Sequence, residues 1–474
     1  MNILLKNKKS CCLRNLIRSL VVLCAFLPSF LTAQVSTLSD WTNLYDGTSS
    51  PGNLTYYVPA GSGEHRILVV GIATTRSTAG TRTVGISYGG QTLIAVNGDL
   101  GDYMLQHTQL YYLDETGLDA ATNNTLSVSI SGGTTRRNLV FAATYDDVCQ
   151  ADPITNSNNF NYGTSTIQSF SFSPGITVNI GDQAVKILHS VRTGNRTPWT
   201  ISNFGNNWTV QEQLTASYNP GGSSSDLGFL TAVGYRAIPT STVTDVSTTT
   251  ISGSSLISMT GLTLGARKYF RSVQNGNWNS TSTWEESLDS ITWSAATSIP
   301  TSGHKTTTII SGHTVTLSAN ASVRSLNVEG ILNTGIYTLS GTTSLAASST
   351  GVINVSGTSN FPSGFTVITL NAGSTVNYNM ARNQNIYATN YSNLTIAGTS
   401  GTKTLLGETT VNGSLTISRP LATNNYQLTI GGNFVQNNTF TQGTGTVIFN
   451  GSTAQNISGS SATTFYNLTV NKIS

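Results

Sequence analysis

The sequence predicts an all-β protein in which an N-terminal β-sandwich of jelly-roll type is followed by a Trp-capped β-solenoid, or β-helix. No segment shows a convincing 3.6-residue apolar period, whereas short stretches of alternating apolar and small polar residues run through the chain. The last third repeats one short sequence pattern at a spacing of roughly 20 residues, which is typical of stacked coils. Charged residues make up only 9% of the chain, against about 25% in an average soluble domain.

Residues 1–33 have the pattern of a secretory signal peptide. A basic beginning precedes an apolar run from Leu20 to Leu31, which is followed by Thr32-Ala33. We expect cleavage after Ala33; a lipid anchor on Cys24 is the alternative, although the leucine before it fits a lipoprotein signal poorly. No later stretch is long and apolar enough to span a bilayer. The sequence therefore predicts an exported protein, secreted or held on the outer cell surface.

The formal charge of +3 comes from this leader, which holds five basic residues and no acid, so that the remaining chain carries −2. A nearly neutral chain has no electrostatic footprint for nucleic acid or for an anionic membrane. Three of the four cysteines also lie in the leader, which leaves Cys149 and excludes an intramolecular disulfide and a cysteine-based zinc site. We interpret Cys149 as a small core residue, with a reactive thiol as the alternative.

Residues 34–265 are predicted to form the sandwich. Ile67–Ile72 is a continuous apolar run suited to a central strand, and Gly89-Gly90 is a two-residue turn between two alternating stretches. Further short stretches with strand character follow, at 109–113, 126–130, 139–143, 184–188 and 229–233. Many short strands separated by turn signals indicate a sandwich. Residues 239–250, rich in Thr and Ser, fit either a linker or an edge strand.

The order of Arg66–Gly71, Tyr88–Leu93 and Tyr111–Leu113 resembles a sandwich module found in many secreted bacterial surface proteins. The resemblance covers roughly residues 50–150. It implies a sandwich fold and carries no catalytic residues.

Residues 315–474 are predicted to be solenoid repeats. The repeated sequence pattern is a short strand of alternating apolar and small polar residues with a Gly or Asn corner, and its copies lie at 325–330, 393–398, 413–418, 427–432 and 467–471. One coil alone cannot bury its apolar face, so repeats of this length stabilise one another by stacking. A longer repeat is also present, because the segment Tyr391–Ile396 is similar to the later segment Phe465–Val470.

Residues 266–314 are predicted to form a Trp-rich cap and the first coil. Gly276-Asn277-Trp278-Asn279, Thr283-Trp284-Glu285 and the later run Ile309–Leu317 together resemble large surface proteins of Bacteroidota, in which this pattern opens a β-helical stalk. The resemblance extends through the Asn-Leu-Thr-Val coils and implies an adhesin-like protein exported by type IX secretion. In physical terms, three Trp rings can cover the first coil, whose strand edges would otherwise recruit other chains.

The resemblance also raises an expectation about the last coil. Proteins of this kind usually finish with a sorting domain, and nothing in the sequence up to Ser474 matches one. We therefore expect an uncovered last coil, with residues 465–474 frayed or self-associating.

Few residues carry catalytic or metal-binding patterns. Gly85–Gly89 matches a nucleophile elbow, but a turn and another strand follow it rather than a helix, so we interpret Ser87 as a strand residue. The close acid clusters are Asp146 with Asp147 and Asp99 with Asp102. Turn chemistry is the preferred interpretation of both, a calcium site the second and catalysis the third. Asp146 and Asp147 are thus the candidate metal ligands, for calcium, and no other cofactor is expected.

The aromatic residues offer candidate sugar-binding sites. Trp278, Trp284 and Trp293 could form a stacking platform on the cap, and Trp199 with Trp208 could do so on the sandwich. Packing in the cap or core is the competing interpretation of all five. The five histidines are scattered without metal-ligand spacing, and we expect them to be satisfied or surface residues.

The solenoid is predicted to break no glycosidic bond. From Val315 onward its only carboxylate side chains are Glu329 and Glu408, about four coils or roughly 19 Å apart at ~4.8 Å between strands. A pair of catalytic carboxylates lies ~5–9.5 Å apart. The sequence thus favours a non-catalytic surface protein with a sandwich head on a β-helical stalk, in adhesion or as envelope scaffold, with glycans or other surface proteins as partners. The alternatives are a carbohydrate-binding module on a spacer and a polysaccharide-degrading enzyme.

Overall fold

The computed structural model describes residues 34–61, 65–77, 82–96, 106–193, 199–218 and 227–472. Their regular structure is almost entirely β-strand, with one short α-helix among them, α2 (Glu115–Ala120), so the predicted all-β fold is confirmed. None of the described helices is long and apolar enough to cross a membrane. The predicted signal peptide and the candidate residues Asp99 and Asp102 lie outside the described residues.

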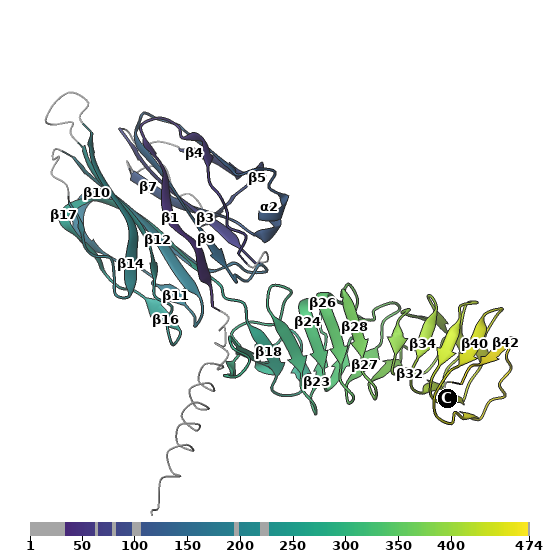
Figure 1. The fold of residues 1–474 in the computed structure, drawn as a ribbon. Helices are drawn as coiled ribbons and strands as arrows, with labels where there is room; N and C mark the ends of the chain where they lie inside the picture. The colour runs from purple at the N-terminus through teal and green to yellow at the C-terminus, as the bar shows by residue number, and fades with distance from the viewer. Residues whose placement is uncertain are drawn as a thin grey trace, which may run out of the picture. The chain divides into compact units, whose positions relative to one another are not determined.

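The first sandwich, residues 36–146, has the strand order of a jelly roll (Figure 1). Its inner sheet is antiparallel with the order β1-β9-β3-β7-β6, formed by Ser36–Gly47, Thr135–Asp146, Ile67–Arg76, Gln106–Leu113 and Ile94–Val96. Its outer sheet has the order β2-β8-β4-β5, formed by Gly52–Thr55, Thr125–Ser131, Thr83–Tyr88 and Gln91–Thr92. The predicted turn Gly89-Gly90 joins β4 to β5, and both glycines have positive φ.

A second sandwich of the same plan occupies residues 154–264, so the range predicted as one sandwich contains two. Its inner sheet has the order β10-β17-β12-β15-β14, formed by Ile154–Phe170, Thr249–Leu264, Gln183–Thr193, Leu227–Arg236 and Trp208–Tyr218. In both inner sheets the strands, numbered as they come in the chain, lie in the order first, fifth, second, fourth and third. The outer layer is smaller and contains β11 (Ile176–Val178) and β16 (Val243–Asp245), whereas β13 (Ile201–Asn203) pairs with the start of β17 in the inner sheet. Residues 239–250 thus supply β16, paired with β11, and the start of the buried strand β17.

The two inner sheets pack against each other, which explains the continuous apolar run of β3. Alternate residues of β3, such as Ile67 and Val69, join a core shared with Val185, Ile187 and Leu262 of the second sandwich. The intervening residues, such as Leu68, pack instead against the outer sheet of the first sandwich. Every residue of β3 is therefore buried, and no alternation remains for the sequence to display.

Polar contacts hold the segment between β17 and the first solenoid strand. The backbone N–H of Ala266 donates to the buried Asp182 carboxylate at 2.8 Å. Arg267 and Lys305 both pair with the Asp147 carboxylate, at 3.3 and 3.1 Å. These contacts join Ala266 to the second sandwich, and Arg267 and Lys305 to the end of the first.

The cap starts the solenoid by supplying its first strands. β18 (Tyr269–Ser272) pairs in parallel with β22 (Thr306–Ile309), and β19 (Gly276–Asn277) pairs in parallel with β23 (Thr314–Thr316). On its other edge β18 is covered by the antiparallel strands β20 (Trp284–Ser287) and β21 (Ser294–Ala295). Because β20 and β21 run antiparallel, they interrupt the parallel pairing at this end of the sheet.

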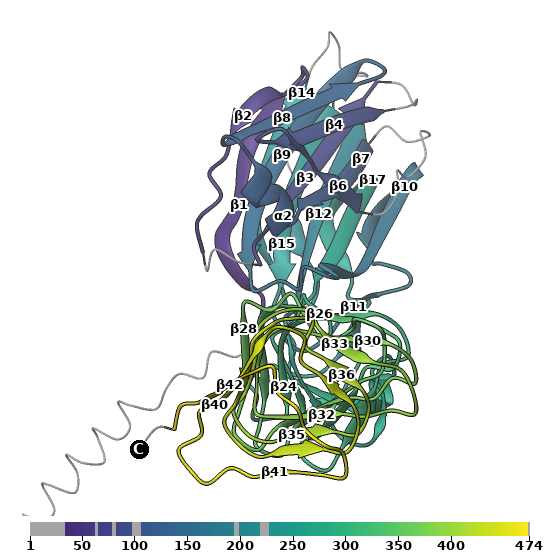
Figure 2. The same ribbon diagram turned by 90° about the vertical axis from the view of Figure 1, so that its right-hand side faces the viewer.

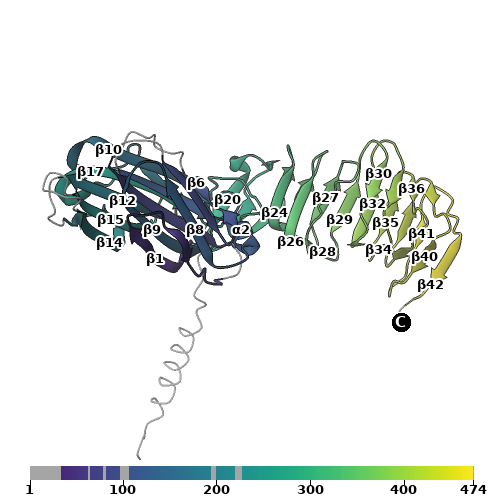
Figure 3. The same ribbon diagram turned by 90° about the horizontal axis from the view of Figure 1, so that it is seen from above.

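About nine coils follow (Figures 2 and 3), and the sheets that face one another in them change part-way. One nine-stranded parallel sheet, which we call the long sheet, runs through all of them as β19-β23-β25-β27-β29-β32-β35-β38-β41; its later strands are Ile331–Asn333, Val352–Val355, Thr375–Tyr378, Asn393–Ile396, Leu415–Ile417, Phe434–Gln436 and Ile457–Ser458. In the first coils it faces a sheet that ends with β24 (Ala321–Val328), β26 (Leu339–Ala347) and β28 (Val367–Leu370).

From residue 384 onward two separate parallel sheets take the place of that partner. One has the order β30-β33-β36-β39, formed by Gln384–Ile386, Lys403–Leu405, Leu421–Ala422 and Phe440–Thr441. The other has the order β31-β34-β37-β40-β42, formed by Asn390–Tyr391, Thr409–Val411, Leu428–Ile430, Thr446–Phe449 and Asn467–Val470. In the earlier coils β24 and β26 already pair in two segments with a register shift between them, and the two separate sheets begin after β28.

The predicted repeat is real, but its copies do not mark equivalent positions. From β23 onward, partners in the long sheet are 17 to 23 residues apart, as in Val315 with Leu332 and Val376 with Leu394. Asn393–Ile396 belongs to the long sheet, whereas the similar segment Asn467–Val470 is β42 of another sheet. The same sequence pattern occurs because every side of a coil that buries alternate residues requires the same alternation of apolar and polar residues.

Removing a cap tryptophan should destabilise the solenoid. Trp278 is fully buried in the solenoid core, whereas Trp293 is half-buried and outside that core cluster. We expect Trp278→Ala to lower the free energy of unfolding by about 3–5 kcal/mol, measured by urea titration with circular dichroism. Trp293→Ala is the matched control and should cost about 1 kcal/mol or less. Equal losses in the two variants would contradict this account of the cap.

Candidate functional site

The cap tryptophans differ in exposure. Trp278 and Trp284 are both buried, with ring centroids 5.0 Å apart in an edge-to-face arrangement. The indole of Trp278 donates to the Pro300 carbonyl at 3.3 Å, and that of Trp284 donates to the Trp278 carbonyl at 2.8 Å. Trp293 lies nearer the surface, with the Arg271 guanidinium 4.4 Å from its ring centroid. The three rings therefore offer no common platform to a sugar, and two of them serve the core.

The sandwich tryptophans pack against the core of the second sandwich, Trp199 buried and Trp208 partly buried. Trp199 is buried, and its indole donates to the Ser190 hydroxyl at 3.1 Å. The ring of Trp208 has the ammonium of Lys186 4.2 Å from its centroid, and its indole donates to Asp245 at 3.2 Å. Trp208 thus presents one ring face to a buried cation rather than to solvent.

Asp146 and Asp147 are used within the protein. Asp146 is buried, and its carboxylate accepts the backbone N–H of Asp147 at 2.8 Å. Asp147 has a positive φ of 61° and pairs with Arg267 and Lys305. Two cations thus supply the positive charge that a calcium ion would bring to this carboxylate. In the described part of the chain no three or more His, Cys, Asp or Glu side chains gather closely enough to share a metal ion.

Cys149 and His304 lie together at the lining of a cavity of about 480 Å³. The thiol is 3.6 Å from Nδ1 of His304, and both residues are buried. Burial raises the pKa of the Cys149 thiol and lowers the pKa of His304 to about 3, so both groups are neutral near pH 7. A thiolate–imidazolium pair is therefore disfavoured, and Cys149 has the environment of a small core residue.

The two solenoid glutamates are exposed and far apart. Glu329 precedes β25, and Glu408 lies between β33 and β34, shortly before β35. Four strand-to-strand steps of the long sheet separate β25 from β35, which is roughly 19 Å at ~4.8 Å a step. The two carboxylates are thus not placed as a pair.

The outer face of the long sheet carries a ladder of amides. Asn333, Asn354 and Asn377 occupy the same outward position in three successive coils. The Asn354 amide donates to Asn333 at 2.7 Å, the Asn377 amide donates to Asn354 at 2.8 Å, and Asn333 donates to the Thr316 hydroxyl at 3.3 Å. Thr395 and Thr416 continue the row. The outer face is thus neutral, polar and regularly spaced.

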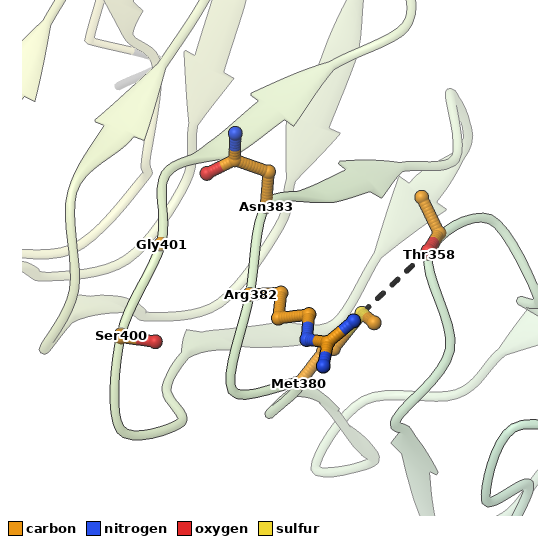
Figure 4. A pocket seen from close by; sticks show the side chains of 6 residues that line it. All are labelled: Thr358, Met380, Arg382, Asn383, Ser400 and Gly401. Atoms are coloured by element: carbon orange, nitrogen blue, oxygen red, sulfur yellow. Dashed lines mark hydrogen bonds between the residues drawn. The ribbon is translucent and has the colours of Figure 1, made fainter.

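A surface cavity of about 530 Å³ lies where the single partner sheet of the long sheet gives way to two sheets (Figure 4). Its lining comes from corners of three successive coils: Thr358, Met380 with Arg382 and Asn383, and Ser400 with Gly401. The Arg382 side chain is exposed, and Figure 4 shows its guanidinium beside the Met380 side chain. We call this the corner cavity.

Below the corner cavity lies a buried ammonium group. Lys403 is fully buried and donates to the carbonyls of Met380 and Arg382, each at 2.6 Å, and of Ser400 at 3.3 Å. All three carbonyls belong to residues that line the cavity. Burial, helped by the charge of Arg419, lowers the pKa of Lys403.

Sequence reasoning did not find this site. A signal was present, because Lys403 alternates with Leu405 at inward positions of β33, where a lysine is out of place unless carbonyls receive it. The corner residues around it could not be placed together from the sequence, since they belong to three different coils.

No family model, curated protein or solved structure matches this chain. The resemblance to Bacteroidota surface proteins therefore stays a prediction, and the case for a function depends on the geometry described above.

Breaking the amide ladder should weaken the solenoid. Asn354→Ala removes two side-chain hydrogen bonds, and we expect the free energy of unfolding to fall by about 1–2 kcal/mol. Val352→Thr changes the other outward position of the same strand, β27, and should alter stability by no more than about 0.5 kcal/mol. Urea titration of both variants tests this, and a loss no larger in Asn354→Ala than in the control would contradict it.

Lys186 should make stability depend on pH. Burial lowers its pKa to about 7, although Asp245 acts in the opposite direction, whereas an unfolded lysine titrates near 10.4. Between these values the unfolded chain binds more protons than the folded one, so the free energy of unfolding rises with pH from about 7 to about 10, by at most ~1.4 kcal/mol per pH unit.

Urea titrations at pH 7, 8, 9 and 10 test this dependence. Lys186→Met should flatten the rise, while Lys472→Met, which removes an exposed lysine, should keep it. The same pH slope in the wild-type chain and in Lys186→Met would show that the dependence has another origin.

Proposed function

We propose that the protein is an exported, non-catalytic surface protein, in which the solenoid is a rigid spacer and the two sandwiches form a head for adhesion or for an envelope scaffold. The continuous parallel stacking of the long sheet carries this proposal. Its nine strands, at ~4.8 Å a step, extend over about 38 Å. Because each coil is hydrogen-bonded to the next, the solenoid resists bending and can hold an attached domain at a distance.

The surface chemistry supports the same role. The outward positions of the solenoid strands are mainly Thr, Ser and Asn, which keep the protein wetted while contributing little charge. The carboxylates Glu329 and Glu408 are not arranged as a glycosidase pair, which favours a binding or spacing role over hydrolysis. The basic and apolar order of residues 1–33 supports export.

Export and surface exposure can be tested in cells that produce the full chain. We expect residues 34–474 to be detected outside the cell membrane, and protease treatment of intact cells to release peptides from them. Deleting residues 2–33 should retain the protein inside the cells. Recovery of the wild-type chain only from the cytosol would contradict the proposal.

A second candidate function is carbohydrate binding by the first sandwich. A shallow groove of about 430 Å³ lies over its outer sheet, with Asn53, Ser87, Thr92, Ser127 and Ser129 among its lining residues. Side chains of this kind can hydrogen-bond sugar hydroxyls.

A glycan array probed with residues 34–474 tests this second function. If the groove binds, Ser87→Trp should fill it and abolish the signal, whereas Tyr57→Trp, at an exposed residue outside the groove lining, should not. A signal that survives Ser87→Trp would exclude this groove as the binding site.

A further inference from the structure

The corner cavity is an electropositive recess on a chain that is otherwise close to neutral. Residues 315–474 hold five basic and two acidic side chains, a formal charge of +3, whereas residues 34–314 hold thirteen basic and eighteen acidic ones, a charge of −5. The cavity has Arg382 in its lining and the ammonium of Lys403 beneath it. Arg419 lies one coil further on, where its guanidinium donates to the Gly398 carbonyl at 2.6 Å.

These cations are not neutralised by the protein. Carbonyl oxygens, which carry no formal charge, receive the Lys403 ammonium. None of the ion pairs among the described residues includes Arg382, Lys403 or Arg419. A recess that gathers positive charge without carboxylates attracts an oxyanion from solution.

We propose that the corner cavity binds the carboxylate or sulfate groups of an acidic polysaccharide, with Arg382 as the ion-pairing residue. Thr358, Asn383 and Ser400, which line the same cavity, are placed to hydrogen-bond the hydroxyls of the sugar that carries the anion. A guanidinium suits this task because it can donate two parallel hydrogen bonds to a carboxylate or a sulfate. The proposal gives the adhesion proposed above a ligand class, and depends on that function only for its biological setting.

Lys403 holds the backbone that lines the cavity in place. Its ammonium joins the corner of residues 380–382 to the corner that contains Ser400, so the two backbone segments are fixed before any ligand arrives. A pre-formed site loses less conformational entropy on binding than a flexible one. The buried charge also adds to the attraction, because it is screened less by salt than an exposed charge.

The geometry favours a polysaccharide over an anionic membrane. Segments that bind anionic membranes usually present clusters of about 4–8 basic residues, whereas this cavity exposes one guanidinium among hydroxyl and amide groups. The cavity is open toward solvent and is lined from three successive coils, so a linear chain can pass through it from coil to coil. A polymer that carries an anion on many of its sugars can bind in several registers.

The test is direct binding by residues 34–474, with oligogalacturonate as the carboxylated probe and heparin oligosaccharides as the sulfated probe. Dextran oligosaccharides are the neutral probe, and vesicles of phosphatidylserine and phosphatidylcholine are the membrane probe. We expect saturable binding to at least one acidic oligosaccharide, weakening as salt is raised, and no binding to dextran or vesicles. Arg382→Gln should weaken it about 10-fold or more, as expected for the loss of a charge-assisted hydrogen bond.

Lys472→Gln is the matched control, because it removes one exposed positive charge elsewhere on the solenoid. Its affinity should stay within about 2-fold of the wild-type value, since an exposed distant charge contributes little. Equal weakening by the two variants, binding to vesicles alone, or no binding to either acidic oligosaccharide would overturn the proposal. Because the assay uses purified protein, failed export would count against the surface function and not against this site.

Discussion

The parallel hydrogen-bond register between neighbouring coils is the constraint on which the solenoid depends. A single coil leaves the N–H and C=O groups of its strands unpaired in the direction of the next coil, and it leaves its inward side chains half-covered. Stacking satisfies both needs at once, so that Leu332, Ile353 and Val376 form a buried row while Asn333, Asn354 and Asn377 form the row outside it. The corners must then let successive backbones approach closely. Gly398 shows this, since it has a φ of 99° and an added Cβ would lie 2.4 Å from the Met380 carbonyl oxygen.

The same constraint explains why polar and charged groups collect at the corners. Along the strands every backbone group has a partner in the next coil, whereas a corner leaves carbonyls to be satisfied by side chains. Lys403 does this for three corner carbonyls, and the Gln384 amide does it for Val355 and Gly357, at 2.8 and 2.9 Å. The positive charge at the corner cavity therefore follows from the need to satisfy these carbonyls, because the group that does so is the ammonium of Lys403.

Much of the fold could be predicted because alternation and turn chemistry act locally. The alternating stretches identify strands of the solenoid and of both sandwiches, and Gly89-Gly90 joins two strands as expected. Residues that act through distant partners were harder to place. Trp278 and Trp293 look alike in the sequence, yet only Trp278 of the two enters the solenoid core, because the position of each ring depends on how the cap strands pair. The corner cavity was missed for the same reason, since Thr358 and Ser400 are 42 positions apart.

The repeated strand order of the two sandwiches has a consequence for how this protein can change over evolutionary time. Their inner sheets share one core, so a substitution at Ile187 or Phe141 affects both halves of the head. The outer layers belong to separate cores, on the far sides of the two inner sheets. A new side chain on either outer layer is therefore tolerated by the other half. The head can accordingly accept substitutions on two opposite surfaces, whereas a substitution at its centre disturbs both halves.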